Sequence, residues 1–193
     1  MATLIGMAGS LRVGSFNAAL LRAAVTLMPQ GSRLDTADIK GIPLYDGDIE
    51  AKQGIPPVVA ALKDRIAAAD GLLLATPEYN NAMPGVFKNA IDWLSRPPSD
   101  IPRVFGNRPV AVIGASPSNF GTILAQDSWL PVLRVLGTQP WFTGRLLVSR
   151  AGNMFDEHGE LLDEKIKTQL QQFMHGFVDF VHSQCKADAT KHH

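Results

Sequence analysis

The chain has 193 residues, of which 46% are hydrophobic and 19% charged, and its 18 basic and 18 acidic side chains give a formal net charge of zero. This length predicts one domain, and the balanced charge provides no global field that would attract nucleic acid or an anionic membrane. Cys185 is the only cysteine, which excludes an intrachain disulfide and a thiolate metal cluster, and no apolar run reaches bilayer length, so we expect a cytoplasmic protein without a membrane span or a metal.

Short apolar runs alternate with helical patterns along the chain. In chain order we expect strand 3–8, helix 16–28, strand 33–39, helix 56–69, strand 71–77, helix 84–95, strand 108–115, helix 121–137, strand 141–149 and helix 161–183. The runs "GLLLA" and "VAVIGA" are apolar throughout, which is typical of parallel strands covered on both faces. Pro131 predicts a kink or a late start in the fourth helix, because proline lacks the N–H of an interior helical bond.

This alternation predicts an α/β fold: a doubly wound, five-stranded parallel sheet with helices on both faces. Such sheets bind ligands at the carboxyl ends of their strands, near the point where the strand order reverses. The stretches 41–57 and 97–109 are rich in proline and glycine, and we expect them to be long loops. One domain is expected over residues 1–185, followed by a flexible tail over 186–193, where the sequence becomes polar and aperiodic.

The loop after the first predicted strand has the composition of a phosphate site. Residues 9–17, "GSLRVGSFN", lead into a helix, where backbone N–H groups and the positive helix end suit a phosphate. The two glycines have the GxxxxG spacing of a P-loop but lack its lysine, and they do not form a GxGxxG fingerprint. Ser10, Ser15, Asn17 and Arg12 together fit a terminal monophosphate. The alternative is that Ser15 only caps the helix and Arg12 is a solvated surface residue.

The loop after the third predicted strand carries a second group of candidates within "TPEYNNAMPGVFKNAIDWLSR", residues 76–96. Pro77 fixes its own φ, and Asn80 and Asn81 tolerate unusual backbone angles, so this loop can present several backbone amides rigidly. Tyr79 adds an aromatic face against which a planar ring system could pack, although ordinary loop packing explains a single tyrosine as well.

The loop after the fourth predicted strand, "GASPSNFG" at residues 114–121, comes close to the G-x-S-x-G nucleophile elbow. Pro117 follows Ser116, and proline has no N–H with which to build an oxyanion hole. The sequence therefore argues against an α/β-hydrolase.

Taken together, "GSLRVGSFNAAL" and "TPEYNNAMPGVFKNAIDWLSRP" resemble the NADPH-dependent FMN reductase family, whose flavodoxin-like members include bacterial chromate, quinone and azo-dye reductases. The resemblance covers about residues 3–150 and continues more loosely through the last predicted helix. It implies a flavodoxin-like domain that binds FMN noncovalently and takes electrons from NADPH or NADH.

The resemblance also implies which residues contact FMN. These are Ser10, Arg12, Ser15 and Asn17 at the phosphate, Pro77, Glu78, Tyr79 and Asn80 along the isoalloxazine ring, and Ser116 and Gly121 near the ribityl chain or the ring. FMN performs the redox chemistry, so Tyr79 and Asn80 are called catalytic only in the sense that they lie beside the ring. The implied acceptor is a quinone, a flavin, an azo dye or chromate.

Family members are commonly homodimers or homotetramers, with Phe87, Trp93, Trp129 and Trp141 as candidates for subunit contacts. Burial inside one subunit explains these aromatic residues equally well. An electron-carrier flavodoxin without NAD(P)H turnover is the alternative function, but zero net charge and Arg12 argue against it. A cofactor-free scaffold would have lost the phosphate-binding groups, which are present here.

Overall fold

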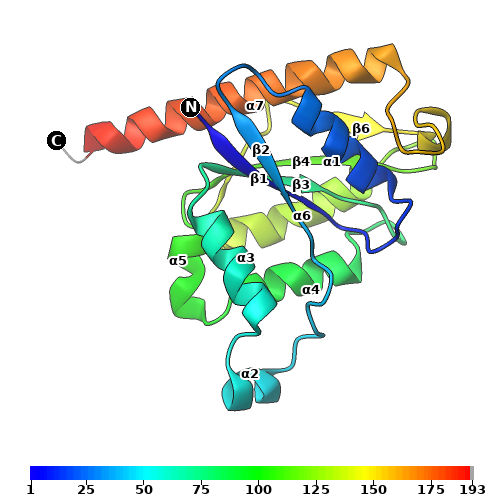
Figure 1. The fold of residues 1–193 in the computed structure, drawn as a ribbon. Coiled ribbons are helices and arrows are strands. Elements are labelled where there is room, and N and C mark those ends of the chain that lie inside the picture. Colours follow the sequence, from blue (N-terminus) through cyan, green and yellow to red (C-terminus); the bar gives the residue numbers. More distant parts are fainter. Residues whose placement is uncertain (192–193) are drawn as a thin grey trace.

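The computed structural model describes the backbone of residues 1–191 and the side chains of residues 1–184 (Figure 1). Its strands are β1 (Thr3–Ala8), β2 (Arg33–Ala37), β3 (Gly71–Ala75), β4 (Pro109–Ala115), β5 (Gln139–Pro140) and β6 (Leu146–Val148). Its helices are α1 (Phe16–Thr26), α2 (Gly47–Gln53), α3 (Pro57–Ala67), α4 (Gly85–Leu94), α5 (Ile101–Val104), α6 (Ile123–Val135) and α7 (Glu164–Lys191), with 3-10 turns at Pro98–Asp100 and Ala151–Asn153.

All strand pairs are parallel, in the order β2-β1-β3-β4-β5, and β6 also pairs with β4. The strand order reverses at β1, whose two neighbours are β2 and β3. This confirms the predicted flavodoxin-like doubly wound sheet. The carboxyl ends of β1, β3 and β4 lie at one edge of the sheet, on the right in Figure 1.

Helices cover both faces of the sheet. One apolar core joins α1 and α7 to the sheet, and a second core joins α3, α4, α5 and α6 to the opposite face. All five residues of β3 are buried, as its continuous apolar run predicted. Phe87, Trp93 and Trp129 are fully buried and Trp141 is partly buried, so these aromatics belong to the subunit's own core.

The fifth strand differs from the prediction. Two short strands, β5 and β6, pair with the beginning and the end of β4 instead of one strand over 141–149. The Trp141 N–H still donates to the Val110 carbonyl of β4 at 2.8 Å, while its ring packs on Phe173 and Phe177 of α7. Gly144 and Gly176 have no side chain that would collide with this ring. The strand is therefore divided after Trp141, whose indole lies against α7.

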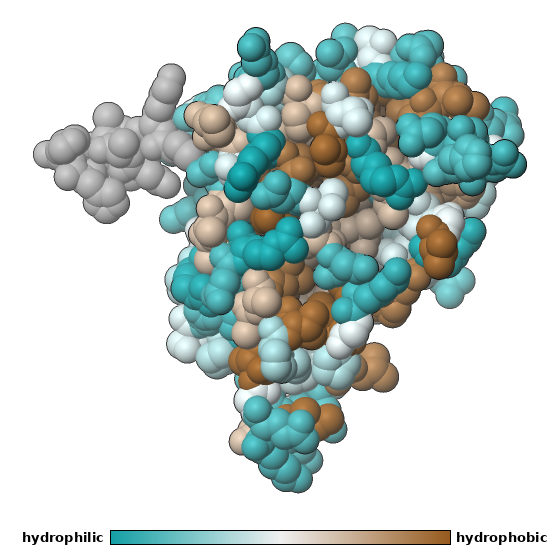
Figure 2. Space-filling view, viewed as in Figure 1, coloured by the Kyte–Doolittle hydropathy of each residue, from teal (hydrophilic) through white to brown (hydrophobic). Residues whose placement is uncertain are grey.

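Two predicted loops contain short helices. α2 lies within 41–57 and buries none of its residues, and Figure 2 shows mostly hydrophilic side chains over this projecting tip. Asn89 of α4 fixes the base of this arm, since its amide accepts from the Tyr45 N–H at 2.8 Å and donates to the Pro43 carbonyl at 2.8 Å. α2 was missed because a helix without a buried face has no apolar period for a sequence pattern to reveal.

The second of these helices, α5, lies within 97–109 and has only four residues.

The last two helices also differ in their limits. α6 begins at Ile123 and continues through Pro131, so of the two predicted effects of this proline the late start was wrong, and a kink stays a prediction. The backbone of α7 continues to Lys191 across most of the predicted tail, 186–193, whose side chains and last two residues lie outside the described part. In the described residues, no helix combines the length and apolarity that a membrane crossing requires.

Candidate functional site

A pocket lies at the carboxyl edge of the sheet, where the loops after β1, β3 and β4 converge. Its lining comprises Ser10, Arg12, Ser15, Phe16, Asn17, Pro77, Glu78, Tyr79, Ala115, Ser116 and Pro117. Eight of the ten residues predicted from the sequence are in this lining, all but Asn80 and Gly121. Three loops far apart in the chain therefore meet at the site that the parallel topology predicted.

The first loop presents the amino end of α1 to the pocket. Ser15 is the N-cap, and its Oγ accepts from the Ala18 N–H at 3.2 Å, so this residue does cap the helix. The same hydroxyl keeps its own proton as a donor. The N–H groups of Phe16 and Asn17 have no acceptor inside the helix, because the first turn precedes the first helical bond. Capping and ligand binding are thus compatible at this loop.

Arg12 supplies the positive charge of the first loop. Its side chain is exposed, and its Nη2 makes only a long contact of 3.4 Å with the Gly14 carbonyl. The guanidinium therefore retains most of its donors. Together with the hydroxyls and the free N–H groups of α1, it forms a donor set that suits a phosphate dianion.

Asn17 has a different position from the other predicted phosphate residues. Its Nδ2 donates to the Ala115 carbonyl at 2.8 Å, and its Oδ1 accepts from the Ala115 N–H at 2.9 Å. The residue is 2% exposed. Its side chain joins the start of α1 to the end of β4, so Asn17 fixes the spacing between the first and third loops.

The second loop forms a tight hairpin. Tyr79 and Ala82 exchange two backbone hydrogen bonds of 3.0 and 3.1 Å, and the intervening Asn80 and Asn81 have φ of 51° and 62°. Positive φ at both central positions is the geometry of a type I′ turn, which asparagine tolerates. This confirms that the two asparagines adopt unusual backbone angles, and it places Asn80 at the exposed tip outside the pocket lining.

Tyr79 closes the gap between the first and second loops. It is 47% exposed, and its hydroxyl lies 3.5 Å from Ser10 Oγ. The phenol therefore reaches the group that was predicted to bind phosphate, while the ring stays accessible to a planar ligand.

The third loop is held by its own serines and by β6. Ser116 donates its N–H to Val148 and accepts from the Ser118 N–H at 3.1 Å. Gly121 has φ of 64° and packs on Leu147, and Gly114 lies so close to Thr122 that any side chain would collide. Gly121 thus shapes the loop from behind and does not line the pocket.

Glu78 is the one carboxylate in the pocket lining, and it is already engaged. Its Oε2 accepts from the N–H groups of Leu124 and Ala125, at 2.9 Å each, at the start of α6. The sequence carries no signal for these two bonds, or for those from Trp129 to Thr76 and from Met83 to Ser128, because the partners lie 45 to 53 positions apart. Within the described residues, the pocket lining keeps hydrogen-bond donors and the cation of Arg12, which forms no ion pair there, the arrangement expected for an anion. Within the described chain, no group of three or more His, Cys, Asp or Glu residues could hold a metal ion.

Comparison with known proteins places these features in a family. The sequence model described as NADPH-dependent FMN reductase matches residues 2–153. An NAD(P)H-dependent FMN reductase of Pseudomonas aeruginosa is 47% identical over 169 residues, which cover 88% of this chain and 89% of that protein. A 2-hydroxy-1,4-benzoquinone reductase from a Burkholderia species is 39% identical, covering 90% of this chain and 92% of its own length.

A solved structure agrees with these matches. The flavoenzyme NAD(P)H:(acceptor) oxidoreductase of Paracoccus denitrificans superposes with a TM-score of 0.84 at 34% identity, covering 95% of this chain and 99% of that one.

Proposed function

The chain belongs to the NADPH-dependent FMN reductase family, and from this premise we propose that it passes a hydride from NADPH or NADH to bound FMN and then electrons to a small-molecule acceptor. FMN supplies the redox chemistry, and the protein binds and orients it. The observation that carries the proposal is the pocket itself: residues 16 and 17 at the amino end of α1, the hydroxyls of Ser10 and Ser15, and Arg12 line one pocket, and the Glu78 carboxylate in that lining is bonded to α6.

The three loops have separate roles in this proposal. Ser10, Arg12 and Ser15 hold the phosphate, and Asn17 contributes its backbone N–H while its side chain fixes the loop spacing. The ring lies along the backbone of 77–80, with Tyr79 and Asn80 beside its reacting part. The third loop, with Ser116 in the lining and Gly121 behind it, borders the ribityl chain.

A quinone is the proposed acceptor among quinones, free flavin, azo dyes and chromate. Relatives named as quinone reductases include the Burkholderia protein and an Escherichia coli protein that is 33% identical over 183 residues, 92% of this chain. The exposed ring of Tyr79 leaves the site open to a flat acceptor. Cytoplasmic location is part of the proposal, because both NAD(P)H and FMN are available there.

We also propose that the chain is a homodimer or homotetramer, assembled through the outer face of α6. Beside α6 lies an apolar groove that includes Leu130 and Phe142, and Val135 on the same helix is 78% exposed. Asp127 and Arg145 border this groove, and within the described residues neither belongs to an ion pair. A two-fold axis would bring each opposite the other in a second copy. A monomeric mass in sedimentation would contradict this assembly.

The phosphate assignment is tested by the double variant Arg12→Ala/Ser15→Ala. We expect FMN affinity to fall by about 3 kcal/mol, because two contacts to a charged group are removed. FMN titration followed by flavin fluorescence measures this loss. Arg22→Ala, which removes an exposed arginine of α1 outside the pocket lining, is the control. Unchanged affinity in the double variant would contradict the phosphate site.

Turnover separates the reductase from an electron carrier. The holoenzyme is mixed anaerobically with NADPH or NADH, and the flavin absorbance is followed. Rapid bleaching that a quinone reverses supports the reductase and ranks the donors. Retained FMN without bleaching would support the flavodoxin-type carrier instead.

A further inference from the structure

Four hydrogen bonds join α6 to the second loop at three positions, and the two at the middle position carry an inference about how that loop is positioned. Trp129 Nε1 donates to Thr76 Oγ1 at 3.1 Å at one end of the loop, and the Met83 N–H donates to Ser128 Oγ at 3.0 Å at the other. Between them, Glu78 binds the start of α6. We propose that Glu78 is a positioning residue, whose carboxylate caps α6 and thereby fixes the backbone that receives the flavin ring.

The helix end requires an external cap. Thr122, the N-cap residue, makes no side-chain capping bond, and the first turn of α6 contains no acidic residue. Two of the N–H groups without helical acceptors are satisfied by one oxygen of Glu78, and its negative charge lies at the positive end of the helix dipole. A residue from another loop thus replaces the local capping side chain.

The middle of the second loop depends on this contact more than its ends do. Thr76 and Trp129 are fully buried, so the first anchor is part of the core. Glu78 is only half-buried, and the hairpin that follows it is exposed at Tyr79, Asn80 and Asn81. The long contact between Tyr79 and Ser10 is the other side-chain bond that the described structure gives this exposed segment. The carboxylate therefore sets the direction in which the hairpin leaves the sheet.

The cap also controls charge inside the pocket. The Glu78 carboxylate accepts two hydrogen bonds at the positive end of the α6 dipole. Its negative charge is therefore stabilised by α6 and is not left free to repel an anion bound in the pocket. If the cap is removed, the loop loses its middle support. The expected effect on FMN affinity rests on the proposed function. The coupling between Glu78 and the loop does not depend on it.

Two variants of Glu78 and one control test this. Glu78→Ala removes the cap, whereas Glu78→Gln keeps an oxygen that can accept the same two N–H groups. Asp163→Ala removes a local carboxylate cap from α7, where Asp163 Oδ1 accepts from the Ile166 N–H at 2.9 Å, far from the pocket in sequence and outside its lining. Hydrogen exchange of the FMN-free protein and FMN titration are measured on all three.

In Glu78→Ala we expect exchange over residues 76–83 and 123–126 to accelerate about tenfold, and the FMN dissociation constant to rise about tenfold, the scale of one lost cap. Glu78→Gln recovers most of both effects, and Asp163→Ala changes neither. Unchanged exchange in Glu78→Ala overturns the coupling. Faster exchange with unchanged FMN affinity overturns the role toward the flavin. If the unsubstituted protein binds no FMN, the proposed function fails, and the exchange result alone decides the coupling.

Discussion

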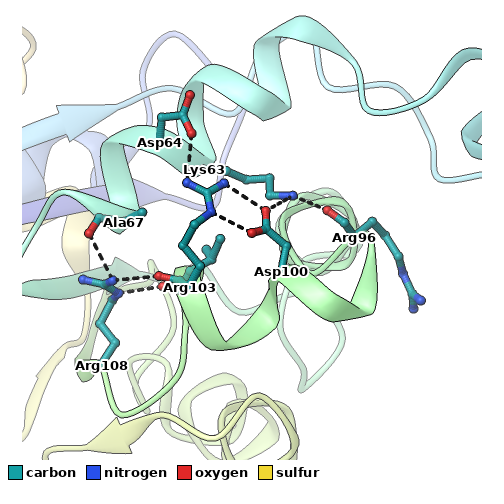
Figure 3. Close-up of polar contacts among 8 residues, drawn as sticks. Lys63, Asp64, Ala67, Arg96, Asp100, Arg103 and Arg108 are labelled. Atoms are coloured by element: carbon teal, nitrogen blue, oxygen red, sulfur yellow. Dashed lines mark hydrogen bonds and ion pairs between the residues drawn. The ribbon is translucent and has the colours of Figure 1, made fainter.

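Two polar clusters in this molecule use their donors and acceptors in opposite ways. Between α3 and α5, Lys63 pairs with Asp100 at 2.6 Å and also donates to the Arg96 carbonyl, while Arg103 binds both Asp100 and Asp64 (Figure 3). In the pocket, by contrast, Arg12 forms no ion pair within the described chain, and the Ser15 hydroxyl and the first N–H groups of α1 keep free donors.

The difference distinguishes charges that hold the fold from charges that await a ligand. Lys63 has a side chain that is 4% exposed, and a buried ammonium persists only where a carboxylate and a carbonyl compensate it. Arg108 near it donates to the carbonyls of Val104 and Ala69. In this cluster Lys63, Asp100 and Arg103 all have charged partners within the chain, whereas the proposed phosphate site keeps donors for an anion.

The largest expected effect lies in the buried cluster. Lys63→Met should lower the free energy of unfolding by about 3 kcal/mol, because Asp100 and the Arg96 carbonyl lose a buried partner. Urea unfolding measures it. Lys88→Met breaks an exposed pair with Asp92 and should cost under about 0.5 kcal/mol. FMN affinity should stay unchanged in both, and a loss of affinity in Lys63→Met would blur the distinction between the clusters.

Asn17 lines the pocket and also holds the fold through its bonds to Ala115, so its replacement should have the next largest effect on stability. Asn17→Ala leaves the Ala115 N–H and carbonyl without partners, so we expect a loss of about 2 kcal/mol in stability together with weaker FMN binding. Unfolding and FMN titration are measured on the same preparation. Asn89→Ala is the control: it also removes two side-chain bonds to backbone groups, those of Tyr45 and Pro43, but outside the pocket lining. It should leave FMN affinity intact.

The smallest effect is a dependence on pH. Hydrogen bonds from Arg103, and next from Lys63, hold the pKa of the Asp100 carboxyl well below its usual value. A depressed folded pKa stabilises the protein above the unfolded value of about 3.9, and that stabilisation disappears as the pH falls through the folded pKa. The stability difference between the unsubstituted protein and Arg103→Gln should therefore be constant near neutral pH and shrink below about pH 4. Urea unfolding across this range measures it, and a difference independent of pH would contradict the assigned pairing.

Elements with an apolar period were predictable from the sequence. The runs in β1, β3 and β4 and the helical patterns of α1, α3, α4 and α6 were found within a few residues of their limits, as was the start of α7, whose end lies eight residues beyond the prediction. The pocket was also predictable, because parallel strands bring their carboxyl ends to one edge and the loops "GSLRVGSFN" and "TPEYNN" follow two of them. Local composition and topology are enough for these features.

Tertiary structure decided which of the predicted side chains are free. Glu78 and Asn17 read as ligand contacts in sequence, yet one caps α6 and the other binds Ala115, 98 positions away. The contact of Trp141 with α7 and the hydrogen bonds of Asn89 to the α2 arm likewise join distant segments. The sequence by itself shows which residue types follow each strand. A hydrogen bond to a distant segment forms only when the two segments pack together, and such a pairing leaves no local pattern in the sequence.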